Sequence, residues 1–291
     1  MGDSTAGPSS DATVDAPPGD LEGLVVLRGG TLSIGTNDGA IARLDGPAGQ
    51  STGLSATKGR LIVRTAGPAL AMADVDQAGG SLPEWHVVKL PMIDQRHQLS
   101  MPILSPRGDK VAVATAAVGR ALTFDVVVSD LSGGASSSVS IDREANGPPV
   151  WIDDSNLLLE GLPIQGGGRF LRLNVVTGRI DPVANDGFGP AISGDGSLLA
   201  VASTDGSVVA VPAAGWLTGH QPHEGSLADA SGSVFELAVD SMGRRIAIGY
   251  ADEAGDPASI AVVIREGGAW RRRVVAVRIA AGAPAMLGWI N

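Results

Sequence analysis

Residues Leu104–Val113 read LSPRGDKVAV, and the same pattern returns along the chain. The clearest copies are Ile192–Val201 (ISGDGSLLAV) and Val239–Ile248 (VDSMGRRIAI). Each copy starts with an apolar residue, passes through a polar turn that contains glycine, and ends in an apolar strand. Glycine supplies the positive φ that a tight turn between antiparallel strands needs. The pattern therefore predicts a β-hairpin that is used repeatedly.

The copies recur at a nearly constant spacing. Weaker copies begin at Leu54 and Trp151, so the anchors fall at positions 54, 104, 151, 192 and 239, with spacings of 50, 47, 41 and 47. Further short apolar strands follow the turns, and no long segment has helical periodicity. A repeat of roughly 40 to 50 residues built from strands is typical of the blades of a β-propeller.

The two ends of the chain complete each other. Residues 284–291 (PAMLGWIN) resemble residues 148–153 (PPVWID), but the turn and strands that should follow are missing there. Strands of the missing kind occur in residues 24–44. We therefore predict an all-β fold, a six-bladed β-propeller over residues 21–291, in which the C-terminal strand pairs with the N-terminal strands and closes the ring. A seven-bladed ring, with a degenerate blade within residues 204–233, is the alternative.

The third repeat, about residues 101–141, carries a family resemblance. Its Ser-Pro-x-Gly-Asp-Lys-apolar turn starts at Ser105, and its later strand ends in Val128–Gly134 (VSDLSGG). These motifs resemble the TolB-type, WD40-like propeller repeat, and the fifth repeat matches it in part. The resemblance implies a propeller fold. Because bacterial members of this family are often exported and bind proteins or envelope components, it also implies a binding role at the cell envelope.

The first twenty residues differ in composition from the rest. Residues 1–20 contain serines, prolines and four aspartates, with Met1 and Val14 as the only bulky apolar side chains. Such a segment buries too little surface to offset its ordering entropy, so we expect a disordered tether with a reach of about 25 Å. It resembles the tether of a bacterial lipoprotein, with a lipid anchor upstream of Gly2. This favours an exported protein, periplasmic or on the cell surface; a flexible terminus of a cytoplasmic protein is the alternative.

Composition excludes several classes of function. The net charge is −10, and Arg271–Arg273 is the only run of basic residues, so nucleic-acid binding is not expected. The chain has no cysteine, which excludes disulfides and thiol catalysis. No apolar run approaches the ~20 residues of a membrane-spanning helix, so no transmembrane span is expected.

Candidate binding residues follow from the topology. In a propeller, the loops that lead into the inner strands and those that join the second and third strands share one face. Several cationic side chains are expected in these loops, together with Glu144 and Glu224. We select as binding candidates Arg96, His97, Arg120, Arg143, Arg169, His220 and His223.

Two pairs of residues have a structural and a functional interpretation. His220 and His223 have the residue types of a metal site, but Pro222 excludes a helix face, and side chains three apart on a strand point to opposite sides. We favour a solvated loop there. Trp151 and Trp289 occupy equivalent inner-strand positions, where we expect packing between blades; a ligand platform beside the channel is the alternative.

These patterns contain no catalytic motif, and we assign no catalytic residue, metal ligand or cofactor. We expect a monomeric, non-enzymatic propeller of the cell envelope that binds a protein partner or scaffolds an assembly through its loop face. The alternative is a propeller hydrolase or lactonase with a metal site at the top of the central channel. Fold alone does not decide between them.

Overall fold

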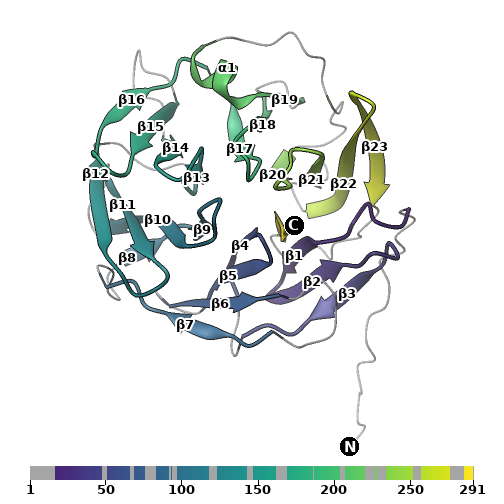
Figure 1. Cartoon of the computed structure of the whole chain (residues 1–291), viewed down its shortest axis with the longest axis horizontal. Helices are drawn as coiled ribbons and strands as arrows, with labels where there is room; N and C mark the ends of the chain where they lie inside the picture. Colours follow the sequence, from purple (N-terminus) through teal and green to yellow (C-terminus); the bar gives the residue numbers. More distant parts are fainter. Residues whose placement is uncertain are drawn as a thin grey trace, which may run out of the picture.

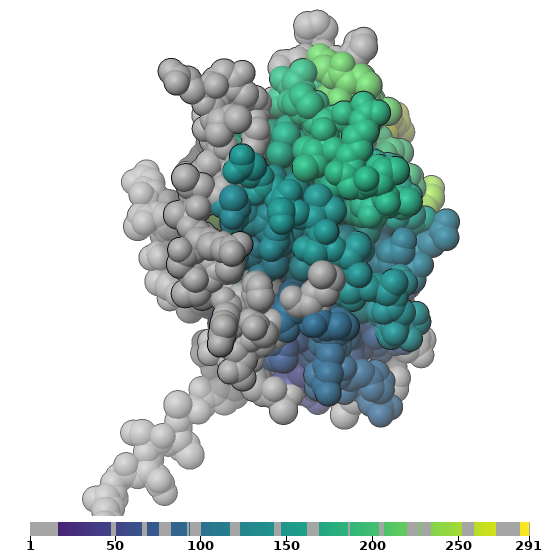
Figure 2. Space-filling model, turned by 90° about the vertical axis from the view of Figure 1, so that its left-hand side faces the viewer, coloured from purple at the N-terminus to yellow at the C-terminus, as the bar shows by residue number. Residues whose placement is uncertain are grey.

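The computed structural model describes residues 17–47, 51–65, 69–75, 83–91, 93, 97–117, 123–142, 147–161, 169–185, 187–203, 207–219, 227, 234–251, 257–275 and 285–290. In these residues the strands form six antiparallel sheets arranged around a central axis (Figure 1). The molecule is a six-bladed β-propeller, as the repeat predicts. Seen from the side, successive blades lie next to one another along the rim in chain order (Figure 2).

The first three blades are built as follows. The first is β24 (Ala285–Trp289), β1 (Leu24–Arg28), β2 (Thr31–Gly35) and β3 (Ile41–Leu44). The second is β4 (Gly53–Thr57), β5 (Arg60–Arg64), β6 (Leu70–Asp74) and β7 (His86–Val88). The third is β8 (His97–Leu99), β9 (Ile103–Leu104), β10 (Lys110–Ala117), β11 (Phe124–Asp130) and β12 (Ser136–Ile141).

The other three blades follow the same plan. The fourth is β13 (Val150–Trp151), β14 (Asn156–Glu160), β15 (Phe170–Asn174) and β16 (Ile180–Pro182). The fifth is β17 (Phe188–Ile192), β18 (Leu198–Ala202) and β19 (Val208–Pro212), and the sixth is β20 (Val234–Val239), β21 (Arg245–Ala251), β22 (Pro257–Glu266) and β23 (Ala269–Val275). The seven-bladed alternative is wrong: in the described part of residues 204–233, the chain forms β19 and the short helix α1 (Ala213–Leu217) rather than another sheet.

Ring closure occurs as the sequence predicts. Strand β24 pairs antiparallel with β1, with Leu24 opposite Trp289 and Arg28 opposite Ala285. The C-terminal strand is the innermost strand of the first blade (Figure 1). The Ile290 N–H also donates to the Gly23 carbonyl at 3.0 Å, which extends the ladder by one residue.

The core consists of one apolar cluster between each pair of neighbouring blades. Successive side chains of a strand point to opposite faces, so each second strand serves two clusters. On β10, Val111 and Val113 pack toward Ile62 of the second blade. Ala112 lies on the other face and belongs to the cluster of Trp151 in the fourth blade. The continuous apolar runs of the second strands reflect this burial on both faces.

The repeated turn has a local chemical cause. Ser105 Oγ accepts a hydrogen bond from the Lys110 N–H at 3.0 Å, which fixes the hairpin. Asp240 has the same role in the sixth blade, where its carboxylate accepts from the N–H groups of Arg244 and Arg245 at 2.7 and 3.1 Å. Either serine or aspartate can therefore occupy this position, because both accept hydrogen bonds from the turn backbone.

The two equivalent tryptophans pack between blades, so that prediction is confirmed. Trp151 is 4% exposed, and its Nε1–H donates to the Ile103 carbonyl of the third blade at 3.1 Å. Trp289 is 3% exposed and donates to the Ala238 carbonyl of the sixth blade at 3.2 Å. Each indole thus joins its blade to the inner strand of the preceding one.

The described N-terminal residues lie against the propeller. The Gly19 N–H donates to the Asn37 carbonyl at 2.8 Å, and Arg245 donates to the Gly19 carbonyl at 3.2 Å. Gly19 therefore contacts the ring, although the sequence analysis places it in the tether. The rest of that predicted segment, residues 1–16, lies outside the described residues. In the described chain, no helix has the length and apolarity to cross a membrane.

Candidate functional site at the channel mouth

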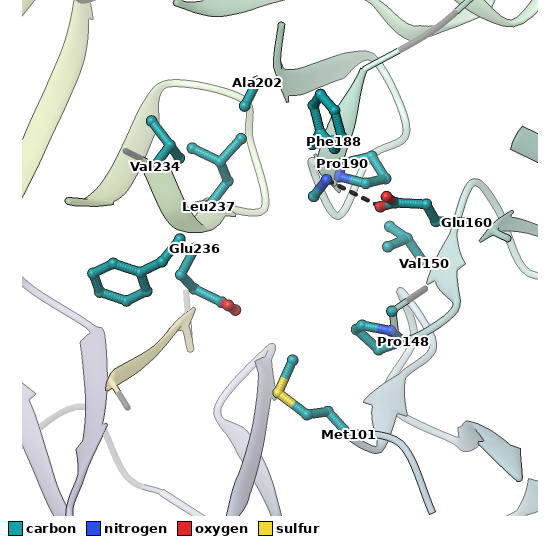
Figure 3. Close-up of a pocket in the computed structure, with 13 residues that line it drawn as sticks. Met101, Pro148, Val150, Glu160, Phe188, Pro190, Ala202, Val234, Glu236 and Leu237 are labelled. Carbon is teal, nitrogen blue, oxygen red and sulfur yellow. Dashed lines mark hydrogen bonds between the residues drawn. The ribbon is translucent and has the colours of Figure 1, made fainter. Parts of the chain in front are cut away.

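The central channel widens into a cavity of about 330 Å³ on the face where the inner strands begin. Residues on or beside the inner strands of four neighbouring blades line it, among them Met101, Val150, Phe188 and Leu237 (Figure 3). Val150 also lines a smaller cavity of about 100 Å³ deeper in the channel. We call the larger cavity, with these lining residues and Glu160 and Glu236, the channel-mouth cavity.

The inner strand of the third blade is interrupted beside this cavity. Both β8 and β9 pair with β10, and Pro102 lies between them. Proline has no N–H to donate to a ladder, so it breaks the pairing. Ser100 Oγ accepts a hydrogen bond from the Ala114 N–H at 2.9 Å, and the break leaves Met101 at the cavity wall.

The inner strands of the fifth and sixth blades each contain a β-bulge at the cavity. On β17, Phe188 pairs with Ala202, but the register then shifts before Ala191. On β20, the register shifts between Val234 and Glu236. A bulge adds one residue to a strand and changes the direction of its side chains. Both bulges therefore alter which side chains reach the channel.

Gly249 makes room for the bulge in the sixth blade. A Cβ atom at this position would lie 2.6 Å from Cζ of Phe235, so the phenyl ring occupies the space that a side chain would need. Phe235 is the extra residue of the bulge, and the next residue is Glu236. The Glu236 carboxyl group points into the open middle of the cavity (Figure 3).

Glu236 lacks the usual partners of a carboxyl group. Among the described residues, no hydrogen bond or ion pair reaches it, and it lies partly buried between apolar side chains such as Leu237. Desolvation penalises the charged form of a carboxyl. Burial therefore raises the pKa of Glu236 from 4.5 to about 8.

Glu160 lines the same cavity, but its carboxylate charge is balanced by neighbouring groups. Its side chain is 5% exposed, and one carboxylate oxygen lies 3.3 Å from Nη1 of Arg169. The other accepts a hydrogen bond from the bulged Gly189 N–H at 3.1 Å (Figure 3). The guanidinium of Arg169 also stacks on Phe188, 3.9 Å from the ring centre. These contacts fix the cavity wall between the fourth and fifth blades.

The structure describes two of the predicted binding residues. Arg169 is 15% exposed and supports the cavity wall through Glu160 and Phe188. His97 was expected in a loop, but it begins strand β8 and pairs with Ala117. The inner strand of the third blade therefore starts before the break at Pro102. The remaining candidates lie outside the described residues, and they are Arg96, Arg120, Arg143, His220 and His223. The two loop glutamates, Glu144 and Glu224, lie outside them as well.

The sequence analysis did not select the two glutamates of the cavity as candidates. A signal was present: Glu160 ends the run Leu157–Leu159, and Glu236 is the only charged residue of β20. In the residues that the structure describes, no group of three or more His, Asp or Glu side chains could hold a metal ion.

No protein-family model matches the chain, and no curated protein matches its sequence. Solved structures do match. TolB from Acinetobacter baumannii has a TM-score of 0.64 at 16% identity, over 93% of this chain and 67% of that one. A putative TolB from Agrobacterium tumefaciens has a TM-score of 0.60 at 11% identity, over 92% of this chain and 98% of that one.

Enzymes share the fold as well. A gluconolactonase from Xanthomonas campestris has a TM-score of 0.53 at 17% identity, over 76% of each chain. An oligogalacturonate lyase and a puromycin-hydrolysing peptidase are also similar. The chain therefore has a β-propeller fold similar to that of TolB. Likeness at this level of identity does not choose between a binding protein and an enzyme.

Proposed function

We propose that this chain is a non-enzymatic binding module of the cell envelope that receives a protein partner at the channel-mouth cavity. The observation that carries the proposal is the cavity itself. It has apolar walls, a volume of about 330 Å³, and a carboxyl group that points into it from Glu236. Concave, mostly apolar sites with a few polar groups are typical of binding sites.

The irregular backbone at the cavity supports the proposal. The bulges of β17 and β20 and the break at Pro102 occur together on the face where the inner strands begin. Bulges are over-represented beside functional sites because they redirect side chains. The resemblance of the third repeat to TolB-type repeats also favours a binding role.

The test is capture of a partner from envelope extract by the full chain. Met101→Trp places an indole in the cavity and should abolish capture of the protein that wild type retains. Val176→Trp is the matched control, because Val176 is 76% exposed and does not line the cavity. Equal capture by the two variants would contradict the proposal.

Attachment to the envelope is part of the proposal. Residues 1–16 would act as a tether for a monomeric propeller, with a lipid anchor upstream of Gly2. The chain has Met1 immediately before Gly2. The gene sequence tests the lipid anchor, since a lipidated protein needs a cysteine codon at that position. Retention of the full-length protein in the soluble cytoplasmic fraction would contradict the envelope location.

A second candidate function is a hydrolase or lactonase with a metal at the top of the channel. Two carboxyl side chains, Glu160 and Glu236, line one cavity, and a gluconolactonase shares the fold. Metal analysis of the purified protein separates the two functions. Stoichiometric calcium or zinc that is lost in Glu236→Gln would favour the enzyme.

A further inference from the structure

The two carboxyl groups of the channel-mouth cavity differ in their surroundings. Glu160 is held by Arg169 and by the Gly189 N–H. Glu236 has no cationic or hydrogen-bonding partner within the described part of the chain. Partial burial without a partner disfavours the charged form of a carboxyl group, and a cation that enters the cavity would stabilise that form.

The strands that pack against β20 do not supply such a cation. Strands β17, β18 and β24 contain no titratable residue. Strand β21 contains Tyr250 in the apolar cluster between blades, and Arg245, which bonds to Asp240 at the other end of the strand. Glu160, which lines the same cavity, is already paired with Arg169.

We propose that the channel-mouth cavity binds an alkylammonium or alkylguanidinium group, with Glu236 as its counter-ion. Two features of the cavity and the charge of the whole chain fit such a group. Its volume is in the range of small-ligand sites. Met101, Val150 and Leu237 offer apolar walls for the methylene stem, which lysine and arginine side chains bury readily. The net charge of −10 attracts cations to the chain from a distance.

This inference rests on the proposed function, because a lysine or arginine side chain of the protein partner would carry the cation. A free small amine presents the same chemistry. Binding follows a simple proton balance: the protonated Glu236 carboxyl releases its proton to the buffer, and the carboxylate pairs with the incoming cation. Below the pKa of Glu236, affinity should therefore rise up to tenfold per pH unit, and it should level off above about pH 8.

The direct test uses n-butylammonium and n-butylguanidinium as probes, with n-butanol as the neutral control. The Glu236 carboxyl ¹³C resonance, assigned by its loss in Glu236→Gln, is titrated with and without probe. A saturating cation should lower the apparent pKa of Glu236 by at least one unit, and n-butanol should not. Calorimetry at pH 7 in buffers of different ionisation enthalpy should detect close to one proton released per cation bound.

Glu236→Gln should weaken binding of both cations at least tenfold and abolish the proton release. Glu160→Gln should weaken binding less and retain the proton release, because that charge is already paired with Arg169. An unchanged pKa of Glu236 at saturating cation, or equal binding of n-butanol and n-butylammonium, would overturn the inference.

Partner capture separates this inference from the proposed function. If the partner's own side chain is the source of the cation, n-butylammonium should displace the captured protein, and Glu236→Gln should lose it. If n-butylammonium binds with proton release but does not displace the partner, the cation comes from a free amine. Capture that survives Glu236→Gln, with no binding of either cation, would leave the proposed function standing and refute the cation site.

Discussion

The guanidinium carbon of Arg245 lies 4.4 Å from the centre of the Trp289 ring. The same guanidinium donates to Asp240 at 3.1 Å and to the carbonyls of Gly19 and Glu22 at 3.2 and 2.8 Å. One side chain thus connects the sixth blade, the C-terminal strand and the N-terminal segment, at the point where the ring closes.

Replacing Arg245 by methionine should lower the free energy of unfolding by about 3 kcal/mol. The substitution keeps the apolar stem but leaves the Asp240 carboxylate, which is 5% exposed, without its counter-ion. Denaturant unfolding measures the change. Arg271→Met is the control, because Arg271 pairs with Glu266 at 3.2 Å on the surface and should change stability by less than about 1 kcal/mol. Equal losses in the two variants would contradict a special role for Arg245.

Removing residues 284–291 should abolish cooperative unfolding. The truncation deletes Leu287, Trp289 and Ile290, which are at most 5% exposed, and each such loss removes about 3 kcal/mol. Their sum is comparable to the whole stability of a typical domain, about 5–15 kcal/mol. Thermal melting followed by circular dichroism tests this. Deletion of residues 1–16 should leave the transition unchanged, and a cooperative transition in the C-terminal truncation would contradict the closure argument.

Much of the fold could be predicted because its determinants are local. The turn around Ser105 is fixed by a hydrogen bond from Lys110, five residues away, so serine or aspartate, glycine and an apolar strand recur in the sequence. The closure could be predicted because the C-terminal copy of the repeat lacks its partner strands. Trp151 and Trp289 occur in the same motif, and each donates one hydrogen bond to the preceding blade.

The candidate site could not be predicted in the same way, because it depends on contacts between blades. Glu160 and the Gly189 N–H are 29 residues apart and belong to different sheets. The bulges that turn Glu236 and Phe188 toward the channel add single residues to strands. The alternation of apolar and polar residues in the sequence does not reveal such insertions. His97 was predicted in a loop, and this was wrong. It lies in β8, a strand on the N-terminal side of the break at Pro102 that also pairs with β10.

Gly249→Ala should destabilise the protein by about 1–3 kcal/mol and disturb the cavity. The added Cβ would meet the Phe235 ring at 2.6 Å, so the ring and the bulge must shift. Because Glu236 follows the bulge, its pKa should move toward the ordinary value as water gains access. Unfolding and carboxyl ¹³C titration measure the two effects. Gly46→Ala, whose Cβ would be 3.6 Å from Leu32, is the control and should leave both quantities unchanged.

The pKa of Glu236 predicts that stability falls between pH 5 and pH 8. The unfolded chain ionises this carboxyl near pH 4.5, whereas the folded protein keeps the proton until about pH 8. The folded state therefore binds more protons in this window, and stability falls by up to about 1.4 kcal/mol per pH unit. Glu236→Gln should remove this slope and be more stable than wild type at pH 8.5. Parallel slopes for the two proteins in urea unfolding at pH 5.5 and 7.5 would refute the assignment.

The pairing of β24 with β1 also determines when the protein can finish folding. During synthesis, β1 leaves the ribosome more than two hundred residues ahead of its partner, so the sheet of the first blade stays incomplete until the other five blades exist. In that interval, the edge of β1 presents free backbone N–H and C=O groups that could pair with another chain. Contacts between such distant segments form slowly. The nascent chain therefore has a long period of exposure, during which a chaperone that covers β1 would protect it from aggregation.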